Sequence, residues 1–213
     1  MTPVYDTDPR DPDEAALFDL ADGVRRLIDT TVRTHADADR LKRAADLVRE
    51  ATELIDVARR PDDDWDVRRY NAISGGANPI AIPLLPTVTG QDLRADMTFG
   101  RAYEGPPGYV HGGMLAAVLD QILGHANGAA GTPGMTARLT VSYRRPTPLD
   151  VPLVVHARND GCEGRKIYAS GRIEVDGKTT VEAEGLFIAP THIQQYESFH
   201  GALSEADGLP RRD

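Results

Sequence analysis

The chain has 213 residues, of which 40% are hydrophobic and 27% charged, and its formal net charge is -9. This balance is typical of a globular protein with room for one domain and an additional segment. A strongly acidic chain disfavours nucleic acid as a partner, because phosphate binding requires a basic face.

The single cysteine, Cys162, stands in a Gly-Cys-Glu-Gly stretch that we interpret as a turn. One cysteine can form neither an internal disulfide nor a cysteine-rich metal site, and the histidines show no metal-ligand spacing. The first residues lack the pattern of a signal peptide, and the longest apolar run is too short to cross a membrane. We therefore expect a cytoplasmic protein with no metal, no separate cofactor and no membrane span.

Residues 1–69 are expected to form a helical extension followed by a linker. Pro12, Asp13 and Glu14 are typical of a helix N-terminus, and the stretch PDDDWD from Pro61 indicates the linker. Apolar residues recur at helical spacing in two stretches between about residues 13 and 60. They are Leu17, Leu20, Val24, Leu27, Ile28 and Thr31 in the first stretch, and Leu41, Ala44, Ala45, Val48 and Ile55 in the second.

Residues 70–190 are expected to form an α+β domain, and the polar residues 191–213 a loosely held tail. A strand is expected over about residues 94–103. A helix follows between Gly112 and Gly128; because it is apolar almost all round, it should be buried. Four strands in a meander should come next, the last two joined at Asp176-Gly177, a strong hairpin signal. One buried helix with long antiparallel strands suggests a sheet wrapped around that helix.

The first strand after the helix, MTARLTVSYRR, alternates with period two, as a half-buried strand does. This alternation places Thr136 on the polar face, opposite Leu139, so Thr136 can contact the buried helix or a subunit interface only if that face, or a bulge at the strand start, turns toward it. The predicted apolar face holds Met135, Ala137, Leu139, Val141 and Tyr143, and the polar face holds Thr136, Arg138, Thr140, Ser142 and Arg144.

The stretch GPPGYVHGGMLAAVLDQILGHANG, from Gly105 to Gly128, carries the candidate chemistry. Gly112 and Gly113 fall at the helix start, where free N–H groups can stabilise a developing oxyanion; simple helix initiation explains the glycines equally well. Asp120 lies two turns inside the helix, so it must be paired, protonated or in contact with water. It is either a functional carboxylate or a structural one bonded to a strand or a second subunit.

The histidines of this stretch give a weaker signal. His111 directly precedes the glycines and can contact a substrate carbonyl or shape the loop. His125 follows Asp120 by five residues, about 500° of helical rotation, so the two side chains diverge. No serine nucleophile motif, phosphate loop or dinucleotide fingerprint is present.

The segments 103–113 and 135–149, with Asp120 between them, resemble the hot-dog-fold acyl-CoA thioesterases. The resemblance is greatest to the phenylacetate-pathway type and the human mitochondrial long-chain enzymes, and it covers about residues 70–190. It implies a helix wrapped by an antiparallel sheet, with subunits associated as a homodimer or a dimer of dimers. The sequence departs from several relatives at Gly105, where they have Asn or Gln, so no side-chain contact to the carbonyl comes from that position.

The resemblance also implies site roles. The loop of one subunit and the acid of its partner would form the site: the Gly112 N–H would polarise the thioester carbonyl and Gly113 would support the helix start. Asp120 would act as general base or as nucleophile, Thr136 would hold the water or the acid, and His111 would assist at the carbonyl. Arginines that could meet the phosphates of CoA are Arg138, Arg144 and Arg145, which are equally explained as solvated surface residues.

Two other functions stay open at this stage. A hot-dog dehydratase or hydratase would need a histidine and a carboxylate that converge on adjacent carbons, which Asp120 and His125 do not do. A non-catalytic acyl-CoA-binding protein would carry the same carboxylate and glycine turn without turnover.

Overall fold

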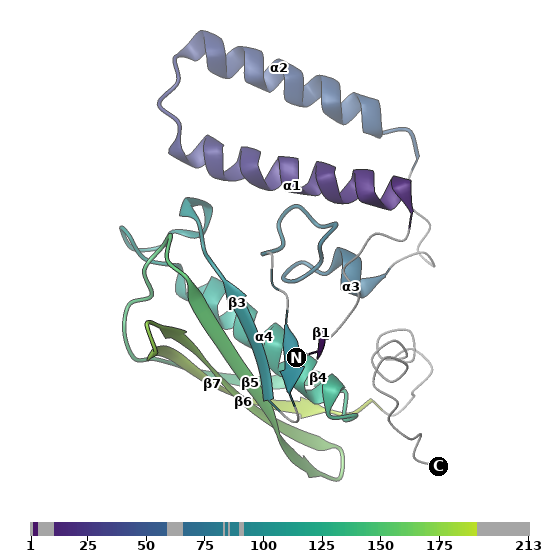
Figure 1. Cartoon of the computed structure of the whole chain (residues 1–213), viewed down its shortest axis with the longest axis vertical. Coiled ribbons are helices and arrows are strands. Elements are labelled where there is room, and N and C mark those ends of the chain that lie inside the picture. The colour runs from purple at the N-terminus through teal and green to yellow at the C-terminus, as the bar shows by residue number, and fades with distance from the viewer. Residues whose placement is uncertain are drawn as a thin grey trace.

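The computed structural model describes residues 2–3, 11–58, 66–82, 84, 86–89 and 92–190 (Figure 1). Residues 61–65 of the expected linker and the tail from residue 191 lie outside this range. The helices are α1 (Pro12–Arg33), α2 (Ala38–Ile55), α3 (Val67–Tyr70), η2 (Arg101–Tyr103) and α4 (Gly112–Ala129). The strands are β1 (Thr2–Pro3), β2 (Thr87–Thr89), β3 (Asp92–Met97), β4 (Met135–Tyr143), β5 (Leu153–Glu163), β6 (Lys166–Val175) and β7 (Lys178–Ile188).

All the strands form one antiparallel sheet in the order β1-β2-β3-β5-β6-β7-β4. The expected four-strand meander is therefore wrong for β4, which pairs with β7 at the sheet edge. Among these four strands, tight turns join β5 to β6 and β6 to β7, the latter with positive φ at Asp176 and Gly177. The segment between β4 and β5 contains no such turn, and alternation within a strand does not say which strand it pairs with.

Two smaller expectations are also corrected. The strand expected over 94–103 ends at Met97, and η2 follows as a single turn of 3-10 helix. Cys162 lies inside β5, exposed and free, and the turn comes after it at Gly164, whose φ is 57°.

Helix α4 packs against the sheet and forms the centre of the hydrophobic core, which confirms the hot-dog architecture (Figure 1). Gly171 and Gly185 allow this close approach, since a Cβ at either position would lie 3.1 Å from a Leu123 methyl group. The buried face of α4 consists of Leu115, Val118, Leu119, Ile122, Leu123 and Ala126.

The expectation that α4 is buried all round is wrong within one chain. Met114, Ala117, Asp120 and Gln121 on its other side remain half-exposed. At Gly124, a Cβ would meet no atom within 4 Å. A prediction from apolar composition therefore gives more burial for α4 than one chain provides.

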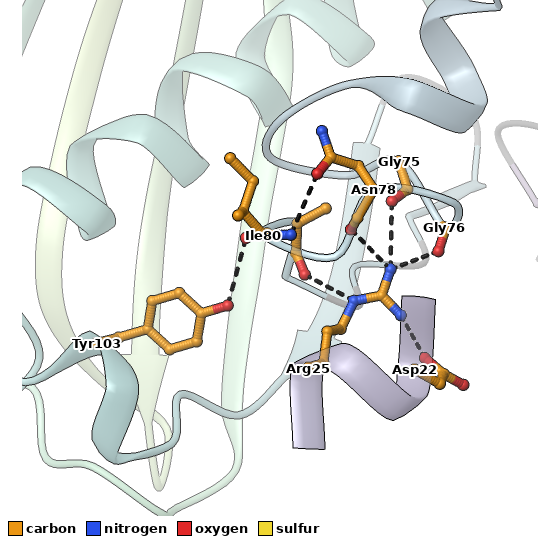
Figure 2. A network of polar contacts seen from close by, with 8 residues as sticks. Asp22, Arg25, Gly75, Gly76, Asn78, Ile80 and Tyr103 are labelled. Carbon is orange, nitrogen blue, oxygen red and sulfur yellow. Dashed lines mark hydrogen bonds and ion pairs between the residues drawn. The ribbon is translucent and has the colours of Figure 1, made fainter. Parts of the chain in front are cut away.

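The N-terminal extension is attached to the domain through α1. Figure 2 shows the Arg25 guanidinium donating to the carbonyls of Ala81 (3.1 Å), Asn78 (2.9 Å), Gly75 (3.4 Å) and Gly76. The neighbouring Tyr103 hydroxyl lies 3.5 Å from the Ile80 carbonyl, as a weak donor. Arg25 thus provides hydrogen-bond donors for several carbonyls in a stretch of irregular backbone.

Both long helices begin at an aspartate cap. The carboxylates of Asp11 and Asp37 accept from the N–H groups of Glu14 and Arg40, each at 2.9 Å. No helix within the described part of the chain is long and apolar enough to cross a membrane.

Candidate active site

The loop from Glu104 to Val110 leads the chain into α4 and is fixed at both ends. The Glu104 carboxylate accepts from the Gly108 N–H (2.6 Å) and from Arg101 (2.5 Å), and these bonds lower the pKa of Glu104. The Val110 N–H donates to the Thr147 carbonyl at 2.9 Å. The loop therefore presents the following turn in one conformation.

Gly105 lies directly against this turn. A Cβ at position 105 would stand 2.8 Å from the His111 Cα, closer than real Cβ atoms come to backbone. This contact gives a physical reason for the glycine at the position where several relatives have Asn or Gln, since any side chain there would displace His111.

His111 is the N-cap residue of α4. Its Nδ1 accepts from the Gly113 N–H at 3.0 Å, and its own N–H donates to the Tyr103 carbonyl at 2.9 Å. An accepting Nδ1 means that the ring is neutral and protonated at Nε2 when this bond is made. His111 therefore accepts the hydrogen bond of the Gly113 N–H and fixes the position of the helix start.

The Gly112 N–H has no acceptor within the described part of the chain. Gly112 is the first helical residue, so its N–H is one of the groups that the helix itself leaves unbonded. A free N–H at the positive end of a helix is suited to stabilise an oxyanion. The two glycines thus differ: the Gly113 N–H is bonded to the cap residue His111, whereas the Gly112 N–H can donate to a ligand.

Tyr143, at the end of β4, is a site residue that the sequence reasoning missed. Its hydroxyl donates to the Gly112 carbonyl at 2.9 Å. The peptide between Gly112 and Gly113 is consequently held at its oxygen by Tyr143 and at its N–H by His111. Its position as the last residue of a predicted strand gave no signal of this contact, because it depends on how β4 passes the start of α4.

Asp120 and Thr136 come together as the resemblance implied. The Thr136 hydroxyl donates to Asp120 Oδ1 at 2.9 Å, and the carboxylate has no other partner within the described residues. Asp120 is half-buried and is therefore not sealed in the core. A carboxylate with one oxygen oriented by a neutral donor and the other free can accept a proton from water or act as a nucleophile.

A β-bulge brings Thr136 to the side of the sheet that faces α4. Thr136 pairs with Phe187 and Arg138 with Leu186, so Ala137 is the extra residue. Because Phe187 is in the core, Thr136 shares its face. The strict alternation that put Thr136 opposite Leu139 is therefore wrong, since one extra residue reverses the pattern on one side of it.

Within one chain, Gly112 and Asp120 are too far apart to act on the same atom. Eight residues of α-helix separate their backbones by about 12 Å along the axis. A substrate carbonyl at the Gly112 N–H of one chain cannot therefore be attacked by water held at the same chain's Asp120.

The three candidate arginines occupy different environments. Arg144 bonds Glu182 at 2.9 Å, and Arg145 bonds the Thr179 carbonyl at 2.6 Å. Both follow Tyr143 and so lie near the start of α4. Arg138 is exposed on the sheet face away from α4, so the structure does not bring it together with Asp120.

The other titratable residues form no second site around Asp120. The imidazole of His125 contacts Gln121, Nε2 to Nε2, at 2.7 Å. Within the described ranges, no three His, Cys, Asp or Glu residues lie close enough to hold a metal ion.

Comparison with known proteins shows which family the chain belongs to. Residues 107–182 match the family model of the thioesterase superfamily. The chain is 42% identical over 91 residues to acyl-coenzyme A thioesterase THEM4 of Bos taurus, covering 42% of this chain and 37% of that one. It is 33% identical over 91 residues to THEM5 of Homo sapiens, with 42% and 37% covered. The chain thus spans well under half the length of these relatives.

Two solved structures extend the comparison. The crystal structure of a thioesterase superfamily protein superposes with a TM-score of 0.74 at 36% identity, covering 88% of this chain and 95% of that one. Zebrafish thioesterase superfamily member 2 shares the fold, with a TM-score of 0.50 at 15% identity over 58% and 92% of the chains. The first match includes most of the chain outside the family model, and on these grounds the chain belongs to the thioesterase superfamily.

Proposed function

We propose that this protein is an acyl-CoA thioesterase, which converts an acyl-CoA and water to a carboxylate and CoA. The observation that carries the proposal is the pair of groups on α4: an unbonded N–H at Gly112 and a carboxylate at Asp120 oriented by Thr136. The names of THEM4 and THEM5 support CoA thioesters as the substrate class.

The geometry supports a division of the chemistry between these groups. The Gly112 N–H would stabilise the oxygen of the tetrahedral intermediate, a contribution of about 3–4 kcal/mol for one well-aimed donor. Asp120 would take the proton of the attacking water; the carbon–sulfur bond then breaks and the CoA sulfur leaves with a proton. Asp120 could instead attack the carbonyl carbon itself; the carbon–sulfur bond then breaks, CoA leaves, and the resulting anhydride is hydrolysed by water.

We further propose that each site is made by two chains, as a homodimer or a dimer of dimers. The separation of Gly112 and Asp120 along one helix supports this arrangement, because only a second chain can bring an Asp120 close to a given Gly112 N–H. The half-exposed side of α4, with open space at Gly124, is the surface on which such a partner would lie.

The phosphates of CoA would be met by Arg144 and Arg145 near the helix start. Arg138, on the far face, would contribute only through a neighbouring subunit. No separate cofactor or metal is part of the proposed reaction. A single cysteine supports a reducing compartment, such as the cytoplasm.

Hydrolysis of a panel of acyl-CoAs with detection of the released thiol tests the reaction. Asp120→Asn should lower kcat/KM by about 10²–10⁴, the usual contribution of a general base, while Asp39→Asn on the exposed surface of α2 should not. Thr136→Val should lower kcat by about 10- to 100-fold, the effect of losing a hydrogen bond to a charged group, and Thr136→Ser should restore it. Equal rates for the Asp120→Asn variant and the native chain would contradict the proposal.

Mixing two inactive variants tests the composite site separately. Asp120→Asn supplies a native Gly112, and Gly112→Pro supplies a native Asp120. Random assembly makes half of the dimers mixed, each with one complete site of two, so about a quarter of native activity should return. If both groups acted within one chain, mixing would restore none.

A further inference from the structure

Helix α2 is less covered than α1 within the described part of the chain. None of its residues is buried, and Leu41, Val48 and Ile55 are 46%, 44% and 55% exposed. In Figure 1 it lies beside α1 at the outer end of the molecule, away from the sheet. An 18-residue helix that buries none of its side chains is marginal in water, because most helix stability in proteins comes from packing an apolar face.

The exposed apolar residues of α2 form a stripe with a seven-residue repeat. Leu41, Val48 and Ile55 are each seven residues apart, with Ala44 and Ala51 in between. This spacing keeps a narrow seam on one side of a helix and is typical of helices that pack along their length. The alanines would let a neighbouring backbone approach closely.

Helix α1 carries a matching stripe on the side that the domain does not use. Its domain-facing side is the one with Ala21, which is 1% exposed, and Arg25. Leu17, Leu20, Val24, Leu27 and Thr31 repeat at intervals of three and four on another side, and Leu20 and Leu27 are exposed. The hairpin α1–α2 therefore presents two apolar stripes that the described part of the chain leaves largely exposed.

The charges along the two helices do not favour close packing of α1 against α2 of the same chain. The first half of α1 (12–22) has four acids and no base, and its second half (23–33) has three bases and one acid. The first half of α2 (38–46) has three bases and two acids, and its second half (47–55) has one base and two acids. In the antiparallel hairpin, basic halves meet near the turn and acidic halves meet at the open end, which is unfavourable.

A second copy of the hairpin reverses this mismatch. A twofold axis perpendicular to the helices, lying between two stacked hairpins, makes α2 of the second copy antiparallel to α2 of the first, and α1 of the second copy antiparallel to α1 of the first. Basic halves then lie against acidic halves in both pairings, and the apolar stripes face one another. A twofold interface of this kind is self-complementary.

We propose that the α1–α2 hairpin is a docking surface for the same hairpin of a second copy of this chain, paired through the stripes about a twofold axis near Val48. This interface is separate from the one proposed for the active site, and hydrolysis is not its readout.

Thiol cross-linking tests the proposal at one residue. In a Cys162→Ser background, Val48→Cys places the only thiol near the proposed axis. Val57→Cys is the matched control: it starts from the same residue type, which is 84% exposed against 44% for Val48. The seven residues from Val48 to the end of α2 at Ile55 correspond to about 10 Å, so the two helix ends would be about 21 Å apart across the axis, and residue 57 follows in the turn after each end.

Mild oxidation or a short bifunctional reagent should give a covalent dimer of the Val48→Cys chain at least tenfold faster than of the Val57→Cys chain. Amide exchange gives a second readout: α2 should be protected in the native protein, Val48→Glu should remove this protection, and Val57→Glu should leave it. Equal or faster cross-linking at residue 57, or exchange of α2 at the rate of a free helix in the associated protein, would overturn the proposal. A dimer formed through the sheet domain alone would give both of these negative results.

Discussion

Gly112→Pro removes one hydrogen-bond donor from the proposed site while keeping the helix. Gly112 is the first residue of α4, the position at which proline is favoured because the helix does not use that N–H. The preceding His111 has φ -62° and ψ 131°, an extended conformation that a following proline accepts. Gly112→Ala is the matched control, because it adds a Cβ and retains the N–H.

The expected magnitude follows from the geometry of this position. A Cβ at residue 112 would stand 3.3 Å from the Tyr143 ring, so both variants share the cost of a small shift of that side chain. Only the proline loses the oxyanion donor, whose removal costs about 10²–10³ in kcat, or roughly 2.7–4 kcal/mol. We therefore expect Gly112→Pro to be at least about a hundredfold slower than Gly112→Ala.

Steady-state hydrolysis of the best acyl-CoA substrate measures this difference, and thermal unfolding of both variants checks that the helix start is intact. Similar unfolding temperatures with a large gap in kcat would support the assignment of Gly112. If proline and alanine gave the same kcat, the Gly112 N–H would not be the oxyanion donor, whatever the absolute rates.

Three further outcomes are expected. Tyr143→Phe should lower kcat by about 2- to 12-fold with little change in KM, because loss of one neutral hydrogen bond (about 0.5–1.5 kcal/mol) loosens the Gly112–Gly113 peptide, which directly follows the one that carries the oxyanion donor; a change in KM alone would contradict this. Arg25→Lys should lower the unfolding temperature by about 2–8 °C, because an ammonium group cannot donate to all the carbonyls that the planar guanidinium reaches, a loss of roughly 1–2 kcal/mol. Arg26→Lys on the exposed side of α1 should leave the unfolding temperature unchanged. Glu104→Gln should destabilise the protein at neutral pH: the pKa of Glu104 is lowered in the folded state, so its contribution is present above the usual pKa of 4.5 and is lost as the pH falls through the lower folded value. The difference in unfolding temperature between the native chain and this variant should therefore shrink below about pH 4.5, and a difference that grew on acidification would contradict it.

Local patterns predicted the elements of the fold well, because each element carries its own signal. The Asp176-Gly177 turn and the alternating runs beside it fixed β6 and β7, and the aspartates and apolar spacing gave α1 and α2. The order of strands in the sheet was harder, because pairing depends on connections. Where a two-residue turn joined two strands, their pairing was predictable; β4, which has none, was placed wrongly.

The site residues on the helix could be predicted from the sequence motif. The contacts made by residues of strand β4 could not, because they depend on the geometry of the sheet. Gly112 and Asp120 stand on one helix, so the motif located both. The orientation of Thr136 required a bulge of one residue at Ala137, which leaves no clear pattern in an alternating strand. The Tyr143 contact depends on where the end of β4 passes α4, a relation between two elements that no local pattern encodes.

Apolar residues that stay exposed in one chain indicate surfaces that a partner can cover. Composition indicated that all of α4 should be buried, yet one side of it, with Asp120, is only half-covered. The stripes of α1 and α2 show the same surplus in a second place. Within the described residues, no element covers either surface. On the proposals made above, a second copy would supply one for each: its own α4 side for the site, and its own hairpin for the stripes. The acid in the middle of an apolar helix is then explained, because Asp120 lies on the surface that a partner would complete and not in the core of its own chain.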